Sequence, residues 1–253
     1  MMCDNETGSY NCRVFNYPTG QHVTYYGNTI NTGKKNENFT KAHHNEEREI
    51  KQEEHCKNVS LNRTKNKIYN IARSITWDWF ITLTFDRGIT DSSDYEKVTE
   101  KLQNFLTNFQ QRYSPNMKYL IVPELHKDKE HYHFHGLLSD VENMQFKFSG
   151  HYSKDKPIFN IVNWKIGFTT ATRVEDTQKV SSYITKYITK ASEQYLKNKK
   201  RYYASRNIEK AQAEYYVIEE EDFLNTYGDR IKYAKTVNIK EAMQQIKYYE
   251  IDY

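Results

Sequence analysis

Three histidines alternate with other residues in the run His131-Tyr132-His133-Phe134-His135, and this spacing is suited to metal binding. Successive side chains of a β-strand point to opposite faces of a sheet, so the three imidazoles would share one face. Neutral imidazole nitrogens are common ligands of divalent cations. The run therefore predicts a metal site on one strand, although one or two of the histidines could instead be ordinary surface residues.

A carboxylate is expected to join these imidazoles. Glu124 lies in the run 117–125, which predicts a second strand, and the charged segment 127–130 indicates a turn between this strand and the histidines. The two strands would then form a hairpin, in which side chains interact across the strand pair. Glu124 is therefore expected close to His133 and His135.

The tetrapeptide pattern Tyr-x-x-Lys occurs twice in succession, with Tyr183, Lys186, Tyr187 and Lys190. Positions four apart are neighbours on a helix, so the two tyrosines would share one face, with the two lysines beside them. The alternative is an amphipathic helix whose tyrosines serve only in packing. The repetition favours function, because packing needs apolar mass and not the same tetrapeptide twice.

Combined, the two groups of residues are suited to transesterification at a phosphodiester. A tyrosine hydroxyl, with a pKa of about 10, is a weak nucleophile at neutral pH. A divalent metal ion would polarise the phosphate and neutralise developing charge. A nearby lysine would favour the phenolate or hold the phosphate.

The elements that must position these residues indicate an α+β fold. The β-branched and aromatic run Phe80–Phe85 predicts a strand, and a helix capped by Asp91 or Ser92 is expected to follow it. This helix would end near Tyr113. Further expected elements are strands over 117–125, 131–138 and 167–174 and a helix over about 176–197, with a variable stretch from 139 to about 165. The order β-α-β-β-β-α predicts a central antiparallel sheet with helices packed on it.

Three motifs stand in a fixed order along the chain: Phe80-Ile81-Thr82-Leu83-Thr84-Phe85, then His133-Phe134-His135 with Glu124 upstream, then the tandem Tyr-x-x-Lys. This arrangement resembles that of rolling-circle replication initiators of the HUH endonuclease superfamily, in which two histidines flank one bulky apolar residue. The tandem tyrosines resemble the two-tyrosine form found in initiators of small single-stranded DNA phages. The resemblance covers roughly residues 70–195.

The resemblance implies specific roles and partners. His133, His135 and Glu124 would bind Mg²⁺ or Mn²⁺, Tyr183 and Tyr187 would be nucleophiles, and Lys186 and Lys190 would assist. The enzyme would nick single-stranded origin DNA, keep the 5′-phosphate on tyrosine and leave a 3′-hydroxyl for a host polymerase. The chain lacks a Gly-x-x-x-x-Gly-Lys-Ser/Thr loop, so a host helicase would unwind the duplex.

Three parts are expected along the chain. Residues 1–70 would form an N-terminal extension without an assigned role, containing a hairpin (13–17 with 22–26) and a polar helix (about 45–74). Residues 71–195 would form the endonuclease domain with the HUH-type sheet, which resembles ferredoxin and RNA-recognition folds. Residues 196–253 are rich in tyrosine and are expected to form a helical extension.

The charge pattern adds a candidate DNA-binding segment. The 253-residue chain has a net charge of only +4, but residues 176–210 hold nine basic and three acidic residues, and six acids follow within 211–229. Lys199, Lys200 and Arg201, interleaved with tyrosines, are predicted to contact single-stranded DNA through phosphates and stacked bases. Solvated helix faces are the alternative.

No apolar run is long enough to cross a membrane, and the N-terminus lacks the features of a signal peptide. Three widely spread cysteines argue against a disulfide framework, so the expected location is the cytoplasm of a bacterial host cell. Two other functions remain open. One is a non-catalytic protein that binds single-stranded nucleic acid; the other is a transposase or mobilisation nuclease with the same chemistry.

Overall fold

The computed structural model describes residues 8–31, 46–126, 128–192, 199–239 and 244–253, except the side chains of 46–54 and 189–192. These residues form two compact units. The central unit comprises Gln52–Glu209, and the terminal unit combines Met1–Lys51 with Lys210–Tyr253. Two antiparallel sheets and four α-helices lie within the described residues, which confirms the predicted α+β class.

A seven-stranded antiparallel sheet forms the centre of the central unit, in the order β6-β7-β8-β3-β5-β4-β9. The strands are β3 (Trp79–Leu83), β4 (Lys118–Leu125), β5 (Tyr132–Ser139), β6 (Phe146–Ser153), β7 (Lys156–Ile161), β8 (Thr169–Arg173) and β9 (Tyr203–Ala204). The hairpin predicted for the histidine strand and the strand before it is present as β4 and β5. Its second strand, β5, pairs with β3, so the first and second sequence motifs lie on neighbouring strands.

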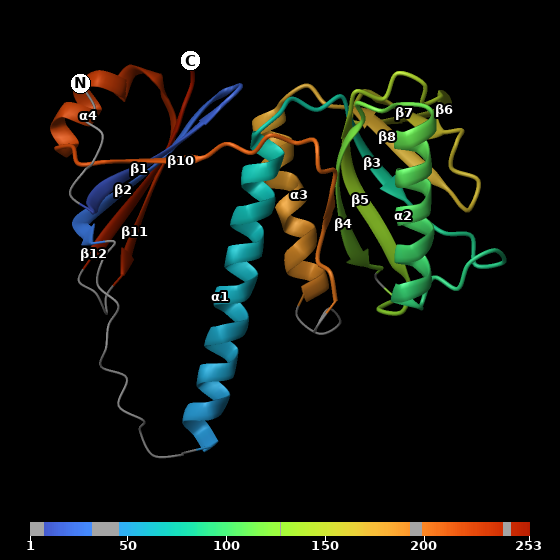
Figure 1. Ribbon diagram of the computed structural model, residues 1–253, viewed down its shortest axis with the longest axis horizontal. Helices are drawn as coiled ribbons and strands as arrows, with labels where there is room; N and C mark the ends of the chain where they lie inside the picture. The colour runs from blue at the N-terminus through green and yellow to red at the C-terminus, as the bar shows by residue number, and fades with distance from the viewer. Residues whose placement is uncertain (1–7, 32–45, 127, 193–198, 240–243) are drawn as a thin grey trace. The chain divides into compact units, whose positions relative to one another are not determined.

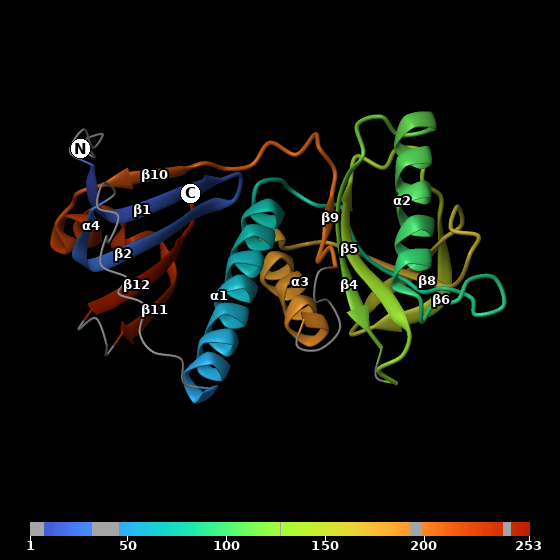
Figure 2. The same cartoon turned by 60° about the horizontal axis from the view of Figure 1, so that its bottom comes forward.

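Helices cover both faces of this sheet, with α2 (Tyr95–Arg112) on one face and α1 (Glu46–Arg73) and α3 (Thr177–Ser192) on the other (Figures 1 and 2). Alternation along β5 divides its side chains between the two layers. Phe134 is fully buried in the cluster beneath α2, whereas Leu137 packs with Ile184 and Ile188 of α3. His133 and His135 have the same parity as Leu137 and therefore face α3.

The first turn of α2 is capped by a residue other than the expected ones. The side chain of Asp94 accepts hydrogen bonds from the backbone N–H groups of Glu96 and Lys97, so the predicted cap at Asp91 or Ser92 is wrong. Asp91 instead accepts from Ser93 in the preceding turn. Short polar side chains close such turns as readily as they cap helices, which makes the two positions hard to separate by sequence.

The expected variable stretch between β5 and β8 contains a further hairpin, β6–β7. Its strands are mostly exposed and therefore lack the apolar alternation that identifies a half-buried strand. The two residues at its tip, Lys154 and Asp155, have positive φ angles of 47° and 64°. This conformation matches the primed turns whose twist suits a two-residue hairpin loop.

The terminal unit is a five-stranded antiparallel sheet in the order β10-β1-β2-β12-β11. Its elements are β1 (Ser9–Tyr17), β2 (Gly20–Asn31), β10 (Ala213–Tyr216), α4 (Glu220–Tyr227), β11 (Ile231–Ile239) and β12 (Gln244–Ile251). The predicted N-terminal hairpin is confirmed as β1–β2. A Cβ at Gly20 would collide with the carbonyl of Ile251, so only glycine permits the close approach of β12 to this turn.

The expected helical structure from 196 to 253 is wrong for most of the described residues in that range. Strands β9 to β12 lie there, together with one eight-residue helix. Strand β12 pairs with β2, more than 200 residues earlier in the chain, and the two expected extensions therefore share one sheet. A local pattern carries no information about such a distant partner. None of the described helices combines the length and apolar character needed to span a membrane.

Candidate active site

The β4–β5 hairpin brings Glu124 and His135 into direct contact. Glu124 lies opposite His133 in the strand register, and its Oε2 is 2.6 Å from Nε2 of His135. The other ring nitrogen of His135, Nδ1, lies 3.1 Å from Oγ1 of Thr82 on β3. His135 is buried, with 8% of its surface exposed, so partners on both nitrogens fix the plane of its ring.

His133 shares the face of His135 but makes a different contact. Its ring stacks on that of His126, with 4.6 Å between the ring centroids. Burial lowers the pKa of His133, and the neighbouring His126 and His135 lower it further. The imidazole is therefore neutral at pH 7, which is the form that binds metals. His131 precedes β5 and its Nδ1 lies 2.9 Å from Oδ2 of Asp128.

The chemistry of Glu124 and His135 fits a divalent cation, because a carboxylate oxygen and an imidazole nitrogen already face each other. His133 is the adjacent third donor, but it would have to leave the ring of His126 to join them. Within the described part of the chain, no group of three histidine, cysteine, aspartate or glutamate side chains is arranged to hold a metal ion. The three predicted ligands therefore lie together on the hairpin, with two of them converging.

Helix α3 places both tyrosines of the tandem motif over this hairpin. The ring of Tyr187 stacks on His135, with 3.8 Å between centroids and 20° between the ring planes. The Tyr187 hydroxyl donates a hydrogen bond to the Tyr183 hydroxyl over 2.7 Å. The exposed fractions differ sharply, at 9% for Tyr187 and 44% for Tyr183. Tyr183 is therefore open to a substrate, whereas Tyr187 supports it from beneath.

The environment of Tyr187 keeps its hydroxyl protonated. Burial raises the pKa of Tyr187 most, followed by the hydrogen bond to Tyr183 and by the negative charges that Tyr183 and Glu124 can carry. The proton of Tyr187 consequently remains in the hydrogen bond to the Tyr183 oxygen. A donated hydrogen bond favours the charged form of the oxygen that accepts it.

Two residues of β3 belong to the site and were not singled out in the sequence. Phe80 lies within 6.2 Å of the rings of His135, Tyr183 and Tyr187, measured between centroids. Thr82, two positions later on the same face, contacts His135. The strand was predicted, and its alternation alone would have placed Phe80 and Thr82 on one face; their contacts required the neighbouring strand and helix.

The predicted basic residues take several positions. Nζ of Lys186 lies 5.6 Å from the centroid of the Tyr183 ring, whereas the side chain of Lys190 is outside the described residues. Nζ of Lys199 lies 4.8 Å from the ring centroid of Tyr95. This arrangement puts Lys186 at the exposed tyrosine.

The remaining two basic residues of the predicted DNA-binding segment also contact the central unit. Nζ of Lys200 lies 4.6 Å from the ring centroid of Tyr203. The Arg201 guanidinium donates to the hydroxyls of Ser60 and Thr64 on α1, over 3.2 and 3.3 Å. Residues 199–201 lie in an irregular segment and not on a solvated helix face, and their contact with DNA stays a prediction.

Residues 78–192 match the model of a family of replication-associated proteins, the ORF2 family. The matched segment runs from the start of β3 to the end of α3 and includes the β4–β5 hairpin and both tyrosines. The match supports identification of the chain as a replication initiator, and that role implies interaction with DNA. Neither the curated proteins nor the solved structures gave a significant match.

Proposed function

We propose that the protein is a rolling-circle replication initiator that nicks and rejoins a single DNA strand at an origin through a 5′-phosphotyrosine. One observation carries the proposal: the Tyr183–Tyr187 hydroxyl pair lies against the His135–Glu124 pair, through the stacking of Tyr187 on His135. The family match over residues 78–192 supports the same conclusion from the sequence.

In the proposed nicking step, the oxygen of Tyr183 attacks the phosphorus and the bond from phosphorus to the 3′-oxygen breaks. The proton lost by Tyr183 is balanced by the proton gained on the released 3′-hydroxyl. The hydrogen bond from Tyr187 favours negative charge on the attacking oxygen. The phosphotyrosine conserves the energy of the broken linkage, so the strand can be rejoined without ATP.

Glu124 and His135, together with His133, are the residues that would hold Mg²⁺ or Mn²⁺. Such an ion would polarise the phosphate and neutralise the charge that develops on it. The neutral imidazoles and the carboxylate supply one negative charge in total, which leaves a bound divalent cation with net positive charge for a phosphate. Thr82 would keep the ring of His135 in place.

The second tyrosine gives a route to release of a circle. While Tyr183 is esterified, Tyr187 would attack the regenerated junction, and Lys186 and Lys190 would assist by holding phosphate. The free 3′-hydroxyl would be extended by a host polymerase behind a host helicase. A transposase or mobilisation nuclease with this chemistry would need only one of the two tyrosines.

The test is a covalent adduct with labelled single-stranded origin DNA in the presence of Mn²⁺, detected on a denaturing gel. We expect an adduct with the native protein, none after addition of EDTA, and none with the double variant Tyr183→Phe/Tyr187→Phe. Binding of the strand without any adduct in the native protein would contradict the proposal and would favour a non-catalytic single-strand-binding protein.

A further inference from the structure

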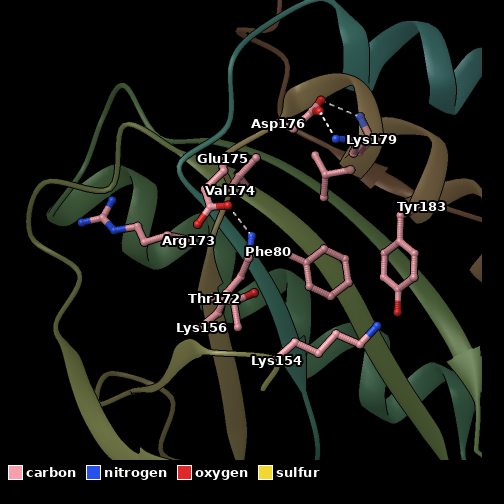
Figure 3. Close-up of a pocket in the computed structure, with 11 residues that line it drawn as sticks. Phe80, Lys154, Lys156, Thr172, Arg173, Val174, Glu175, Asp176, Lys179 and Tyr183 are labelled. Atoms are coloured by element: carbon pink, nitrogen blue, oxygen red, sulfur yellow. Dashed lines mark hydrogen bonds and ion pairs between the residues drawn. The ribbon is translucent and has the colours of Figure 1, made fainter. Parts of the chain in front are cut away.

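An open pocket of about 520 Å³ lies beside Tyr183 on the α3 side of the central sheet. Its wall combines Phe80 of β3, Lys154 and Lys156 of the β6–β7 hairpin, and Glu175, Lys179 and Tyr183 around the start of α3 (Figure 3). The volume lies within the range of sites that bind small molecules. The pocket therefore has room for about one nucleotide next to the exposed tyrosine.

The aromatic part of the wall offers a surface for a base. The rings of Phe80 and Tyr183 lie 5.4 Å apart, measured between centroids, with their planes at 63°. Phe80 is only half-buried, and Tyr183 is exposed. Stacking on an aromatic ring holds a base of any identity, because every base has a π-face.

The cations of the wall favour an anion. Lys156 and Lys179 each pair with a carboxylate, Glu175 at 2.6 Å and Asp176 at 3.0 Å. Both pairs are solvent-exposed and therefore weak, so a phosphate can compete for these lysines. Lys154 has no ion-pair partner among the described residues, and its side chain runs beneath Phe80 toward the Tyr183 hydroxyl (Figure 3).

The position of Lys154 is conformationally unfavourable for a lysine. The first residue of a two-residue primed turn is most often asparagine and the second glycine, because both φ angles are positive. Lys154 and Asp155 occupy these positions with φ angles of 47° and 64°. A residue that is poorly suited to its backbone and points into a pocket indicates a role beyond the fold.

We propose that this pocket binds one nucleotide of the single-stranded DNA substrate, with its base against Phe80 and its phosphate at Lys154. This inference rests on the proposed function, which supplies the single-stranded substrate. Phe80 touches both the pocket residue Tyr183 and the site residue His135. The strand would therefore pass from the pocket over β3 toward His135, with the phosphate to be cut beside Tyr183.

The first test uses Lys154→Asn, which removes the charge and suits the turn. We expect the variant to melt no earlier than the native protein but to bind fluorescein-labelled (dT)20 more weakly, measured by anisotropy in EDTA. Loss of one phosphate contact lowers the salt slope by about 0.7, which corresponds to a loss of affinity of roughly eightfold at 0.05 M salt and roughly threefold at 0.2 M.

Two matched variants control this test. Asp155→Gly improves the same turn and keeps Lys154, so its affinity should not fall. Lys147→Asn removes an exposed lysine of the same hairpin that does not line the pocket, so its affinity and salt slope should equal those of the native protein. Equal affinity and equal salt slope for Lys154→Asn and the native protein would overturn the proposal.

A second measurement locates the base. An oligonucleotide carrying 5-iododeoxyuridine, irradiated on the native protein in EDTA, should crosslink to peptides that contain Phe80 or Tyr183. Crosslinks confined to other peptides would overturn the proposed pocket. Both measurements are independent of chemistry: a missing tyrosine adduct with intact Lys154-dependent binding would refute only nicking, and an adduct with Lys154-independent binding would refute only the pocket.

Discussion

At the scale of single residues, the two tyrosines of the tandem motif occupy different environments. Tyr183 is exposed and accepts a hydrogen bond, whereas Tyr187 is buried against His135 and donates it. The four-residue spacing on a helix brings the hydroxyls within reach of each other but does not make them equivalent. The proposed chemistry therefore predicts unequal consequences of removing each hydroxyl.

We expect Tyr187→Phe to slow nicking of a simple oligonucleotide roughly tenfold or more, because a hydrogen bond to a charged group contributes about 1.5–3 kcal/mol. Tyr183→Phe should slow it further, since only the buried hydroxyl remains, and the double variant should form no adduct. Initial rates of adduct formation, with peptide mapping of the attached tyrosine, measure this order. A Tyr183→Phe variant that nicks at the native rate would contradict it.

The contact between Thr82 and His135 makes a second prediction at this scale. Partners of the distal nitrogen orient a ligating imidazole, and their loss typically lowers metal affinity about 10- to 100-fold. Thr82→Val should therefore weaken Mn²⁺ binding by such a factor, while Thr82→Ser, which keeps the hydroxyl, should not. Titration of Mn²⁺ followed by electron paramagnetic resonance measures the affinity. Equal affinities of the valine and serine variants would remove Thr82 from the metal site.

At the scale of elements, the cap of α2 couples local sequence to stability. Hydrogen bonds from the backbone N–H groups of Lys97 and Glu96, and contact with the Lys97 side chain, hold the pKa of Asp94 below its usual value of 3.8. A carboxyl whose pKa is lowered on folding stabilises the native state above its unfolded-state pKa, and this stabilisation is lost as pH falls through the folded-state pKa.

Asp94→Ala should therefore lower the unfolding midpoint at pH 7, and the difference from the native protein should shrink as pH falls below about 3.8. Asp94→Asn is the matched control, because asparagine also caps helices but does not titrate. Urea unfolding at pH 7 and pH 3 tests this. A difference that is equally large at both pH values would show that the carboxylate of Asp94 does not provide the stabilisation.

At the scale of the whole molecule, the terminal unit is held together by residues from both ends of the chain. Cys12 of β1 and Ile251 of β12 lie in one apolar cluster with Phe223 of α4, and this cluster shares no residue with the two clusters of the central unit. Burial raises the pKa of Cys12 to about 12. The thiol therefore stays protonated at pH 8 and reports on opening of this unit.

Ile251→Ala should destabilise the terminal unit by about 2–5 kcal/mol and accelerate modification of Cys12 by a thiol reagent at pH 8 roughly thirtyfold or more. The measurement is made with Cys3 and Cys56 replaced by serine. Ile239→Ala, at a position of β11 that is 36% exposed, should change the rate much less. An unchanged rate in Ile251→Ala would mean that Cys12 is modified without opening of the β12 contact.

The sequence by itself determined the features that depend on near neighbours. Alternation with a period of two placed His133 and His135 on one face of a strand, and the four-residue repeat placed Tyr183 beside Tyr187 on a helix. The β4–β5 hairpin followed from two apolar runs around a charged turn. These predictions succeeded because each rests on geometry within one or two elements.

The tertiary structure decided which of these faces meet and which residues far away in sequence join them. It set the ring of His133 on His126, brought Phe80 and Thr82 to His135, and carried Lys154 on an exposed hairpin to Tyr183. It also inserted β12 between β2 and β11, where a helix was expected. Pairing between distant strands and the choice of side-chain conformation depend on the packing of all layers at once, and no local pattern in the chain encodes them.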